Sequence, residues 1–223
     1  MTGSPRPHVV YLHGFASSAQ SSKAQYFGRR YAELGITVHT PDFNVPDFET
    51  LTVSRMIAQV ETVVRDLSPG PVVLMGSSMG AFVAWHAAPR LREHLPSHPV
   101  THLVLLAPAV TFGVDREADF GPGVVDAWER DGVREFFHYA YGEARSVNYA
   151  LYEDAATWDA FAVDLDLPIV IFQGRRDDVV DPAMVERWAA ARPRVTLHLL
   201  DDGHQLTDSM PSIWARTEPF LQA

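Results

Sequence analysis

The stretch "VVLMGSSMGAF", residues 72–82, places two adjacent serines between two glycines at the end of an apolar run. Read as G-x-S-x-G, it has Ser78 at its centre, with Gly76 two positions before it and Gly80 two positions after it. A serine held in a sharp turn from a strand into a helix brings these flanking positions together, where a Cβ atom would clash. The apolar residues before the motif predict the strand, and "AFVAWHAA" after it predicts the helix. We therefore interpret Ser78 as a candidate nucleophile and Ser77, which lacks the symmetric glycine frame, as a spacer.

Strand-like apolar runs recur around this motif and alternate with helical patterns. The runs are "HVVYL" from residue 8, "ITVHT" from 36, "VVLM" from 72, "HLVLLA" from 102, "IVIF" from 169 and "VTLHLL" from 195. Their continuous hydrophobicity is typical of strands buried on both faces of a parallel sheet. The alternation predicts an α/β fold, with a mostly parallel, doubly wound sheet of about six or seven strands and helices on both faces. Ligands of such sheets bind at the carboxyl ends of the strands.

One segment, residues 111–161, interrupts this alternation. It holds 11 of the 24 aromatic residues of the chain, has no strand pattern, and is broken by "FGPG" and "RDG". We predict a small helical aromatic cap over the strand ends, within a single domain of residues 1–223; the alternative is a hydrophobic cluster that binds no ligand. The cap and the segment "PDFNVPDF" supply the candidate substrate-binding residues: Phe43, Phe112, Trp128, Phe136 and Tyr149. They favour an apolar acyl or aryl group of modest size.

The composition excludes several other classes of protein. A formal net charge of −10, with no cluster of Lys and Arg, argues against nucleic acid as a partner. The absence of cysteine excludes disulfides, thiolate catalysis and cysteine-ligated metal sites. No run approaches the roughly 18 apolar residues of a membrane-spanning helix, and no signal-peptide pattern is present, so we expect a cytoplasmic protein without a membrane span. The oligomeric state stays open.

A serine hydroxyl needs a base, and the candidate base is His204 in "LLDDGHQL". It stands in a glycine-containing turn just after the last strand-like run, from which an imidazole can reach Ser78. A carboxylate must then orient the histidine ring. The segment "FQGRRDDVVDP" follows a core strand and offers Asp177, nearest the strand end, and Asp178; its Asp181 is better explained as the cap of the next helix. Further alternatives are Asp201 and Asp202, which we expect in a surface turn.

The oxyanion of an acyl-transfer reaction also needs two backbone donors. One is the N–H of the residue after the nucleophile, Met79, and the other comes from the loop after an early strand. The dipeptide "HG" at residues 13–14 ends the first strand and places the Phe15 N–H in that position. Because the donors must converge on one oxygen, we predict that Phe15 and Met79 form an oxyanion hole.

Histidine spacing does not favour a metal site. His94, His98 and His102 are spaced by four residues, but Pro96 and Pro99 prevent the helix that would align them. We therefore expect neither a metal ion nor an organic cofactor.

Together, "YLHGFASSAQSSKA", "GSSMG", "DDVVD" and "DGH" resemble the small single-domain α/β-hydrolases, specifically the YqiA-type esterases. The most distinctive part is the long opening motif, which ends in "SKA" at residues 22–24. The resemblance covers both halves of the core and does not extend to the aromatic segment. It implies a serine hydrolase of esters or thioesters with the triad Ser78, Asp177 and His204, in the chain order typical of α/β-hydrolases.

Two features depart from that family pattern. The glycine commonly doubled after the nucleophile is here Gly80 followed by Ala81. The acid loop, "GRRDD" at residues 174–178, has more residues between its glycine and its aspartates than the family pattern. Either Asp177 or Asp178 can therefore be the acid of the triad.

The sequence thus predicts a serine esterase that cleaves small-molecule carboxylic esters through an acyl-enzyme. The same triad serves an acyl-CoA or other thioesterase, which is the first alternative. A non-catalytic ligand-binding protein of the hydrolase fold is the second, and the complete set of catalytic residues argues against it.

Overall fold

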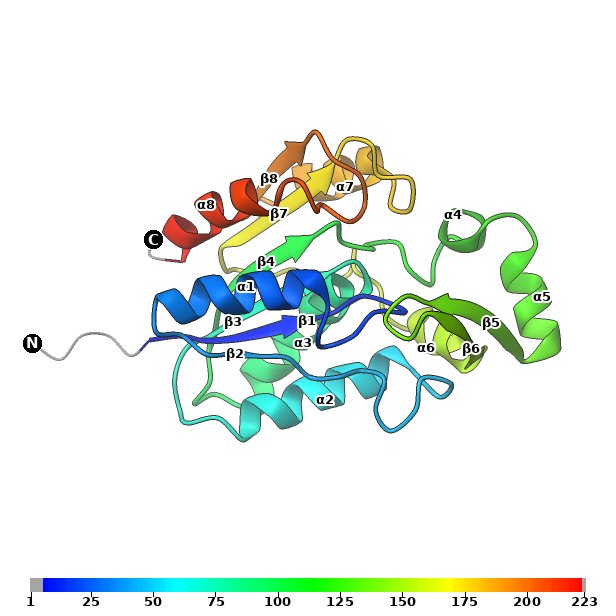
Figure 1. The fold of residues 1–223 in the computed structure, drawn as a ribbon, viewed down its shortest axis with the longest axis horizontal. Helices are drawn as coiled ribbons and strands as arrows, with labels where there is room; N and C mark the ends of the chain where they lie inside the picture. The colour runs from blue at the N-terminus through cyan, green and yellow to red at the C-terminus, as the bar shows by residue number, and fades with distance from the viewer. Residues whose placement is uncertain (1–5, 222–223) are drawn as a thin grey trace, which may run out of the picture.

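The computed structural model describes residues 6–221, which form a parallel sheet covered by helices (Figure 1). The sheet has six strands in the order β2-β1-β3-β4-β7-β8, and every neighbouring pair is parallel. Its strands are β1 (His8–Leu12), β2 (Val38–His39), β3 (Val72–Ser77), β4 (Val100–Leu106), β7 (Ile169–Gly174) and β8 (Val195–Leu200). The predicted doubly wound α/β fold is confirmed.

Helices cover both faces of the sheet. They are α1 (Ser22–Glu33), α2 (Val53–Arg65), α3 (Met79–His94), α4 (Arg116–Phe120), α5 (Val124–Asp131), α6 (Ala150–Ala155), α7 (Pro182–Ala190) and α8 (Met210–Phe220). Strand β1 shows why its apolar run is continuous: Val9 and Tyr11 pack with α1 and α8, whereas Val10 and Leu12 pack with α2, α3 and α7. Successive side chains of a strand point to opposite faces, so a strand buried on both faces needs apolar residues throughout.

A side-chain cap and a proline determine where α7 begins. Asp181 accepts a hydrogen bond from the N–H of Ala183 at 2.9 Å, and Pro182 is the first residue of α7. A cap residue followed by proline is a strong helix start, because the proline lacks an N–H that the first turn would leave unpaired. The prediction that Asp181 caps this helix is confirmed.

Residues 111–161 differ in one respect from the expectation of a helical cap. They contain α4, α5 and α6, and also an antiparallel hairpin of β5 (Val133–His138) and β6 (Glu143–Asn148). The expectation of helical pieces alone was therefore wrong. In β5 the exposed face carries Val133 and Phe137, while Phe136 and His138 face inward. Because both faces carry apolar residues, the sequence lacks the alternation of apolar and polar residues that predicts a half-buried strand.

This segment sits at the end of the molecule toward which β1 and β4 run (Figure 1). Its buried residues Trp128, Val147, Leu151 and Tyr152 belong to the same hydrophobic cluster as the residues between the sheet and α2, α3 and α7. On the basis of this shared core we propose that the described residues form a single domain, with residues 111–161 as a cap. None of the helices within residues 6–221 combines the length and apolar character needed to cross a membrane.

Candidate active site

Ser78 occupies the turn between β3 and α3 in a conformation that L-amino acids rarely adopt. Its φ is 54° and its ψ is −117°, with β3 ending at Ser77 and α3 beginning at Met79. The N–H of Ser78 donates to the carbonyl of Leu106 in the neighbouring strand β4 at 2.8 Å, which anchors the turn to the sheet. The Ser78 side chain stays partly exposed at the carboxyl end of β3.

The two glycines of the motif make this turn possible. A Cβ atom on Gly76 would lie 2.6 Å from the backbone nitrogen of Ala81, and one on Gly80 would lie 2.6 Å from the carbonyl oxygen of His13. A Cβ on Gly80 would also overlap the carbonyl oxygen of Leu12. Real side chains do not come this close to backbone atoms, so both positions exclude every residue except glycine.

His204 and Asp177 lie together in the loops after β8 and β7. The Nδ1 atom of His204 is 2.9 Å from Oδ2 and 3.0 Å from Oδ1 of Asp177. The side chain of Asp177 is fully buried, whereas 12% of the His204 side chain is exposed. With Nδ1 bonded to the carboxylate, Nε2 is left as the nitrogen that can take up a proton.

Several donors converge on the Asp177 carboxylate. Besides His204, it accepts hydrogen bonds from Nε2 of Gln173 at 2.7 Å and from the N–H groups of Val179 and Val180 at 2.9 and 2.8 Å. Burial alone raises the pKa of Asp177, but the hydrogen bond and charge of His204 and the two N–H groups outweigh it, so the pKa lies below its ordinary value. Asp177 is therefore ionised at neutral pH.

The other carboxylates considered as orienting groups have different surroundings. Asp178 is exposed, and Asp201 pairs with Arg176 on the surface. Asp202 is buried, but it accepts the N–H of Ser209 at 3.0 Å within its own loop. Of the acids left open by the sequence, the structure brings Asp177 to the histidine.

The remaining link of the predicted triad is between Ser78 and His204. Within residues 6–221, no hydrogen bond joins the Ser78 hydroxyl to the His204 ring. Such contacts are commonly long in unliganded enzymes and shorten when substrate binds. The pairing of these two side chains, and with it the triad, stays a prediction.

The loop after β1 lies against the turn of Ser78. A Cβ atom on Gly14 would be 3.4 Å from the Cβ of Ser78, so the backbone of this loop passes directly beside the serine. In the described part of the chain, the N–H groups of Phe15 and Met79 take part in no hydrogen bond. Both predicted oxyanion donors are therefore free to bind a ligand oxygen, although their convergence on one oxygen stays a prediction.

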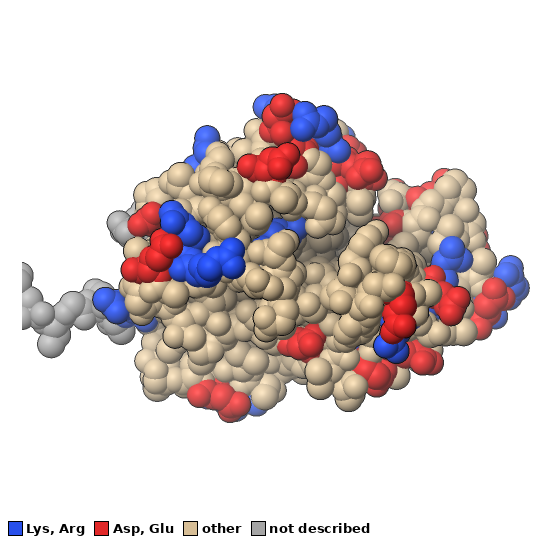
Figure 2. Space-filling view, in the orientation of Figure 1, with Lys and Arg blue, Asp and Glu red and all other residues tan. Residues whose placement is uncertain are grey.

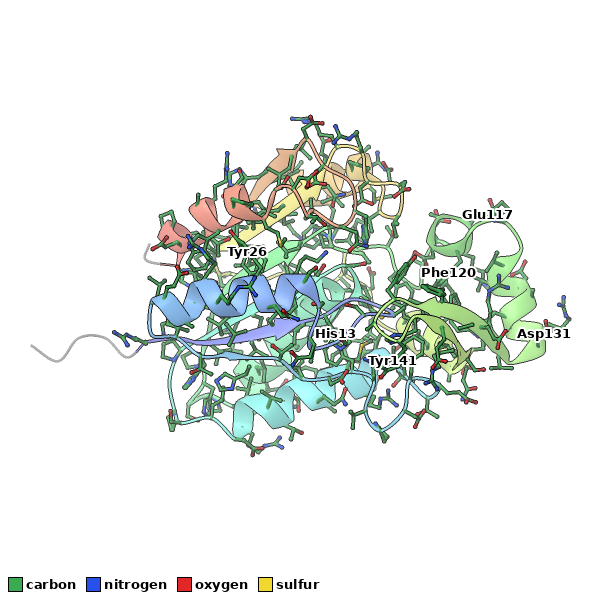
Figure 3. The ribbon with its side chains drawn as sticks, in the orientation of Figure 1. His13, Tyr26, Glu117, Phe120, Asp131 and Tyr141 are labelled. Carbon is green, nitrogen blue, oxygen red and sulfur yellow. The ribbon has the colours of Figure 1, made fainter. Side chains whose placement is uncertain are left out.

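His13 orients this loop, a role that the sequence reasoning did not assign. The N–H of Phe43 donates to Nε2 of His13 at 3.0 Å, which leaves Nδ1 to donate to the carbonyl of Gly14 at 2.9 Å. Because the peptide between Gly14 and Phe15 is planar and trans, fixing its carbonyl directs the Phe15 N–H to the opposite side. In Figure 3, His13 lies at the end of β1.

The predicted substrate-binding aromatic residues fall into two groups. Phe43 and Trp128 are each 1% exposed and Phe112 is 5% exposed, so all three pack in the core and have almost no surface for a ligand. Phe136 and Tyr149 are half-buried, and the ring of Phe136 is 5.1 Å from that of Phe15. Phe136 thus packs on a residue that supplies a predicted oxyanion donor, and none of the five is established as a substrate contact.

The three histidines with four-residue spacing have separate partners. Nδ1 of His94 is 3.5 Å from Oε2 of Glu61, and Nε2 of His98 is 3.1 Å from the carbonyl of Leu67. The ring of His102 packs on Phe220 instead. Across residues 6–221, no three His, Asp or Glu side chains lie together as a set that could hold a metal ion.

Known proteins resemble this chain in sequence and in structure. The sequence profile of the uncharacterised protein family UPF0227 matches residues 8–220. The palmitoyl-protein thioesterase ABHD10, mitochondrial, of Bos taurus is 29% identical over 90 residues; the match covers 37% of this chain and 28% of that protein, less than a third of its length.

Solved structures extend the likeness over nearly the whole chain. A protein of Agrobacterium vitis S4 proposed to be a hydrolase is 25% identical, with a TM-score of 0.86 over 97% of this chain and 88% of that chain. The alpha/beta hydrolase domain-containing protein 10 from mouse is 18% identical, with a TM-score of 0.80 over 98% of this chain and 91% of that chain. The α/β-hydrolase fold that the opening motifs resemble is confirmed. Because the profile match spans almost every described residue, this chain belongs to the uncharacterised protein family UPF0227.

Proposed function

We propose that this protein is a serine hydrolase that cleaves carboxylic esters of modest apolar acyl or aryl groups. His204 removes the proton of Ser78 as the hydroxyl attacks the acyl carbonyl, and Asp177 holds the imidazole and stabilises its charged form. The N–H groups of Phe15 and Met79 bind the oxyanion. The imidazole gives its proton to the leaving alcohol, and the acyl group stays bound to Ser78. His204 then takes a proton from water as the water attacks the acyl-enzyme, and it returns that proton to the Ser78 oxygen as the carboxylic acid leaves.

The observation that carries this proposal is the backbone of Ser78. A positive φ costs a residue other than glycine about 1–2 kcal/mol, and two glycines with no room for a Cβ surround it. A plain turn avoids that cost by using glycine at the central position. Strain of this kind, in a chain that also holds a buried carboxylate–imidazole pair, supports an enzyme over a ligand-binding protein, which needs no activated hydroxyl.

The surface also supports a small-molecule substrate. On the face shown in Figure 2, Lys and Arg side chains occur in small groups beside Asp and Glu, and no basic patch suited to a polyanion gathers there. The same view shows an indentation between the main body and the part that carries residues 111–161.

A thioesterase is the second candidate, and one observation favours it. The bovine relative with 29% identity over 90 residues is a palmitoyl-protein thioesterase. The same triad attacks esters and thioesters, so the two activities share every step above. Values of kcat/KM for matched ester and thioester substrates of the same acyl group separate the two, across a series of acyl lengths.

The first prediction tests Ser78 directly. Ser78→Ala lowers kcat/KM for p-nitrophenyl butyrate at least about 1000-fold, because no other group supplies the nucleophile. A fluorophosphonate labels the wild-type protein at Ser78 and does not label the variant, as intact mass and peptide mapping show. The matched control is Ser77→Ala, which keeps both the turnover and the label. An active Ser78→Ala protein, or a wild-type protein that is neither active nor labelled, contradicts the proposed function.

A further inference from the structure

The chain contains a single lysine among its 18 Lys and Arg residues. This residue, Lys23, is the second residue of α1, and only 8% of it is exposed. Two general effects make a buried lysine at the start of a helix unfavourable. A buried ammonium group loses hydration, and the first turn of a helix favours negative charge because its N–H groups point outward. The first turn of α1 contains no acidic residue that could offset this.

The ammonium group of Lys23 makes hydrogen bonds that offset its loss of hydration. Its Nζ donates to the carbonyl oxygen of Gln205 at 2.8 Å and lies 3.4 Å from Oε1 of the same residue. Gln205 directly follows His204 in the chain. The ammonium group therefore holds α1 to the loop that carries the candidate base, over a separation of 182 residues.

The electrostatic surroundings point to the same site. Burial lowers the pKa of Lys23 to about 8, while the charges of Asp177 and Asp202 oppose this shift. The Asp177 carboxylate that faces His204 thus also balances the buried ammonium. At neutral pH most Lys23 side chains are therefore protonated.

We propose that Lys23 is a positioning residue for the hydrolytic reaction: its ammonium group fixes the backbone after His204 and thereby holds that imidazole in place. This inference rests on the proposed function, because it assigns His204 the role of base.

The kinetic test uses Lys23→Met, which keeps an unbranched side chain and removes the charge. We expect kcat for p-nitrophenyl butyrate to fall about 10- to 100-fold, as for a displaced catalytic group, with KM changed less than about threefold. The control is Arg29→Gln, which removes an exposed positive charge from the same helix and leaves both values unchanged. A folded Lys23→Met protein with the wild-type kcat overturns the inference.

A second measurement does not depend on the folding of that variant. Lysine-selective ¹⁵N labelling of the wild-type protein gives one side-chain signal, because the chain has one lysine. We expect this signal to titrate near pH 8, and at lower pH in Asp177→Asn, where an opposing charge is lost. A signal that titrates at about 10.4, the ordinary value for lysine, and does not respond to Asp177→Asn overturns the inference. The fluorophosphonate label and wild-type turnover test the proposed function separately, so the failure of one is distinguishable from the failure of the other.

Discussion

At the scale of single residues, the carboxylate of Asp177 is the most constrained group of the candidate site. It is fully buried and accepts hydrogen bonds from Gln173, Val179 and Val180 in addition to its contact with His204. Three partners besides the histidine hold its oxygens in place, so the imidazole is oriented by a group that cannot rotate away. This rigidity is what an orienting acid requires.

Substitution of Asp177 tests this role. Asp177→Asn places an NH₂ group where only acceptors fit, which favours the wrong tautomer of His204, so we expect kcat to fall about 1000- to 10,000-fold. The neighbouring Asp178 is exposed and provides a matched control: Asp178→Asn leaves kcat near the wild-type value. The measurement is steady-state hydrolysis of p-nitrophenyl butyrate at pH 8. The reverse ranking of the two variants refutes Asp177 as the orienting acid.

At the scale of elements, the unit that forms the site is the turn from β3 into α3. The amino end of α3 approaches the end of β1 so closely that Gly80 faces the backbone of Leu12 and His13. This approach goes with the position of the loop after β1, whose Gly14 lies beside Ser78. The glycine spacing therefore serves the packing between two elements as well as the turn itself.

Two glycine substitutions with opposite expected effects on the free energy of unfolding test this packing. Gly80→Ala forces a Cβ atom into the backbone of β1, so we expect the free energy of unfolding to fall by at least about 2 kcal/mol. Gly28 lies in α1 with no atom within 4 Å of a built Cβ, so Gly28→Ala raises the free energy of unfolding by about 0.5–1 kcal/mol. Urea denaturation followed by circular dichroism measures both. Equal stability of the two variants contradicts the close approach of α3 to β1.

At the scale of the whole molecule, a half-buried carboxyl group joins two helices of the cap. Asp119 of α4 accepts hydrogen bonds from the hydroxyl of Tyr152 in α6 at 2.8 Å and from the N–H of Gly113 at 2.9 Å. Burial raises the pKa of Asp119 to about 6, because its two hydrogen bonds only partly offset the loss of hydration. Phe120, the next residue and labelled in Figure 3, packs on Trp128 and Phe136, so the same helix anchors the aromatic cluster.

The raised pKa of Asp119 predicts how stability depends on pH. A carboxyl group whose pKa is higher in the folded protein stabilises the fold when protonated. That contribution is complete below about pH 4 and is lost as the pH rises through about 6, and it amounts to at most about 3 kcal/mol. Asp119→Asn keeps the acceptor oxygen without the charge, so we expect it to gain stability relative to the wild type between pH 4 and pH 7.

Denaturation in urea at several pH values measures this difference. Glu117→Gln removes an exposed carboxylate from the same helix, and this control follows the wild-type pH dependence. A difference between Asp119→Asn and the wild type that stays constant with pH shows that the carboxyl group does not titrate in the predicted range.

The sequence alone was sufficient for the parallel sheet with helices on both faces and for the turn at Ser78. Both depend on residues that are close together in the chain: runs of apolar residues for strands buried on two faces, and glycines two positions from a strained serine. The cap of α7 at Asp181 was predictable for the same reason. Such features require no knowledge of distant segments, because local geometry already excludes the alternatives.

Only the tertiary structure decided which distant groups meet. It joined Asp177 rather than Asp178 to His204, because the loops after β7 and β8 lie side by side in the sheet order. It buried Phe43 and Trp128, which composition alone places at a ligand, and it brought Lys23 to the loop of the base. These pairings join residues far apart in sequence, and their energy depends on the burial and the partners that the complete fold supplies.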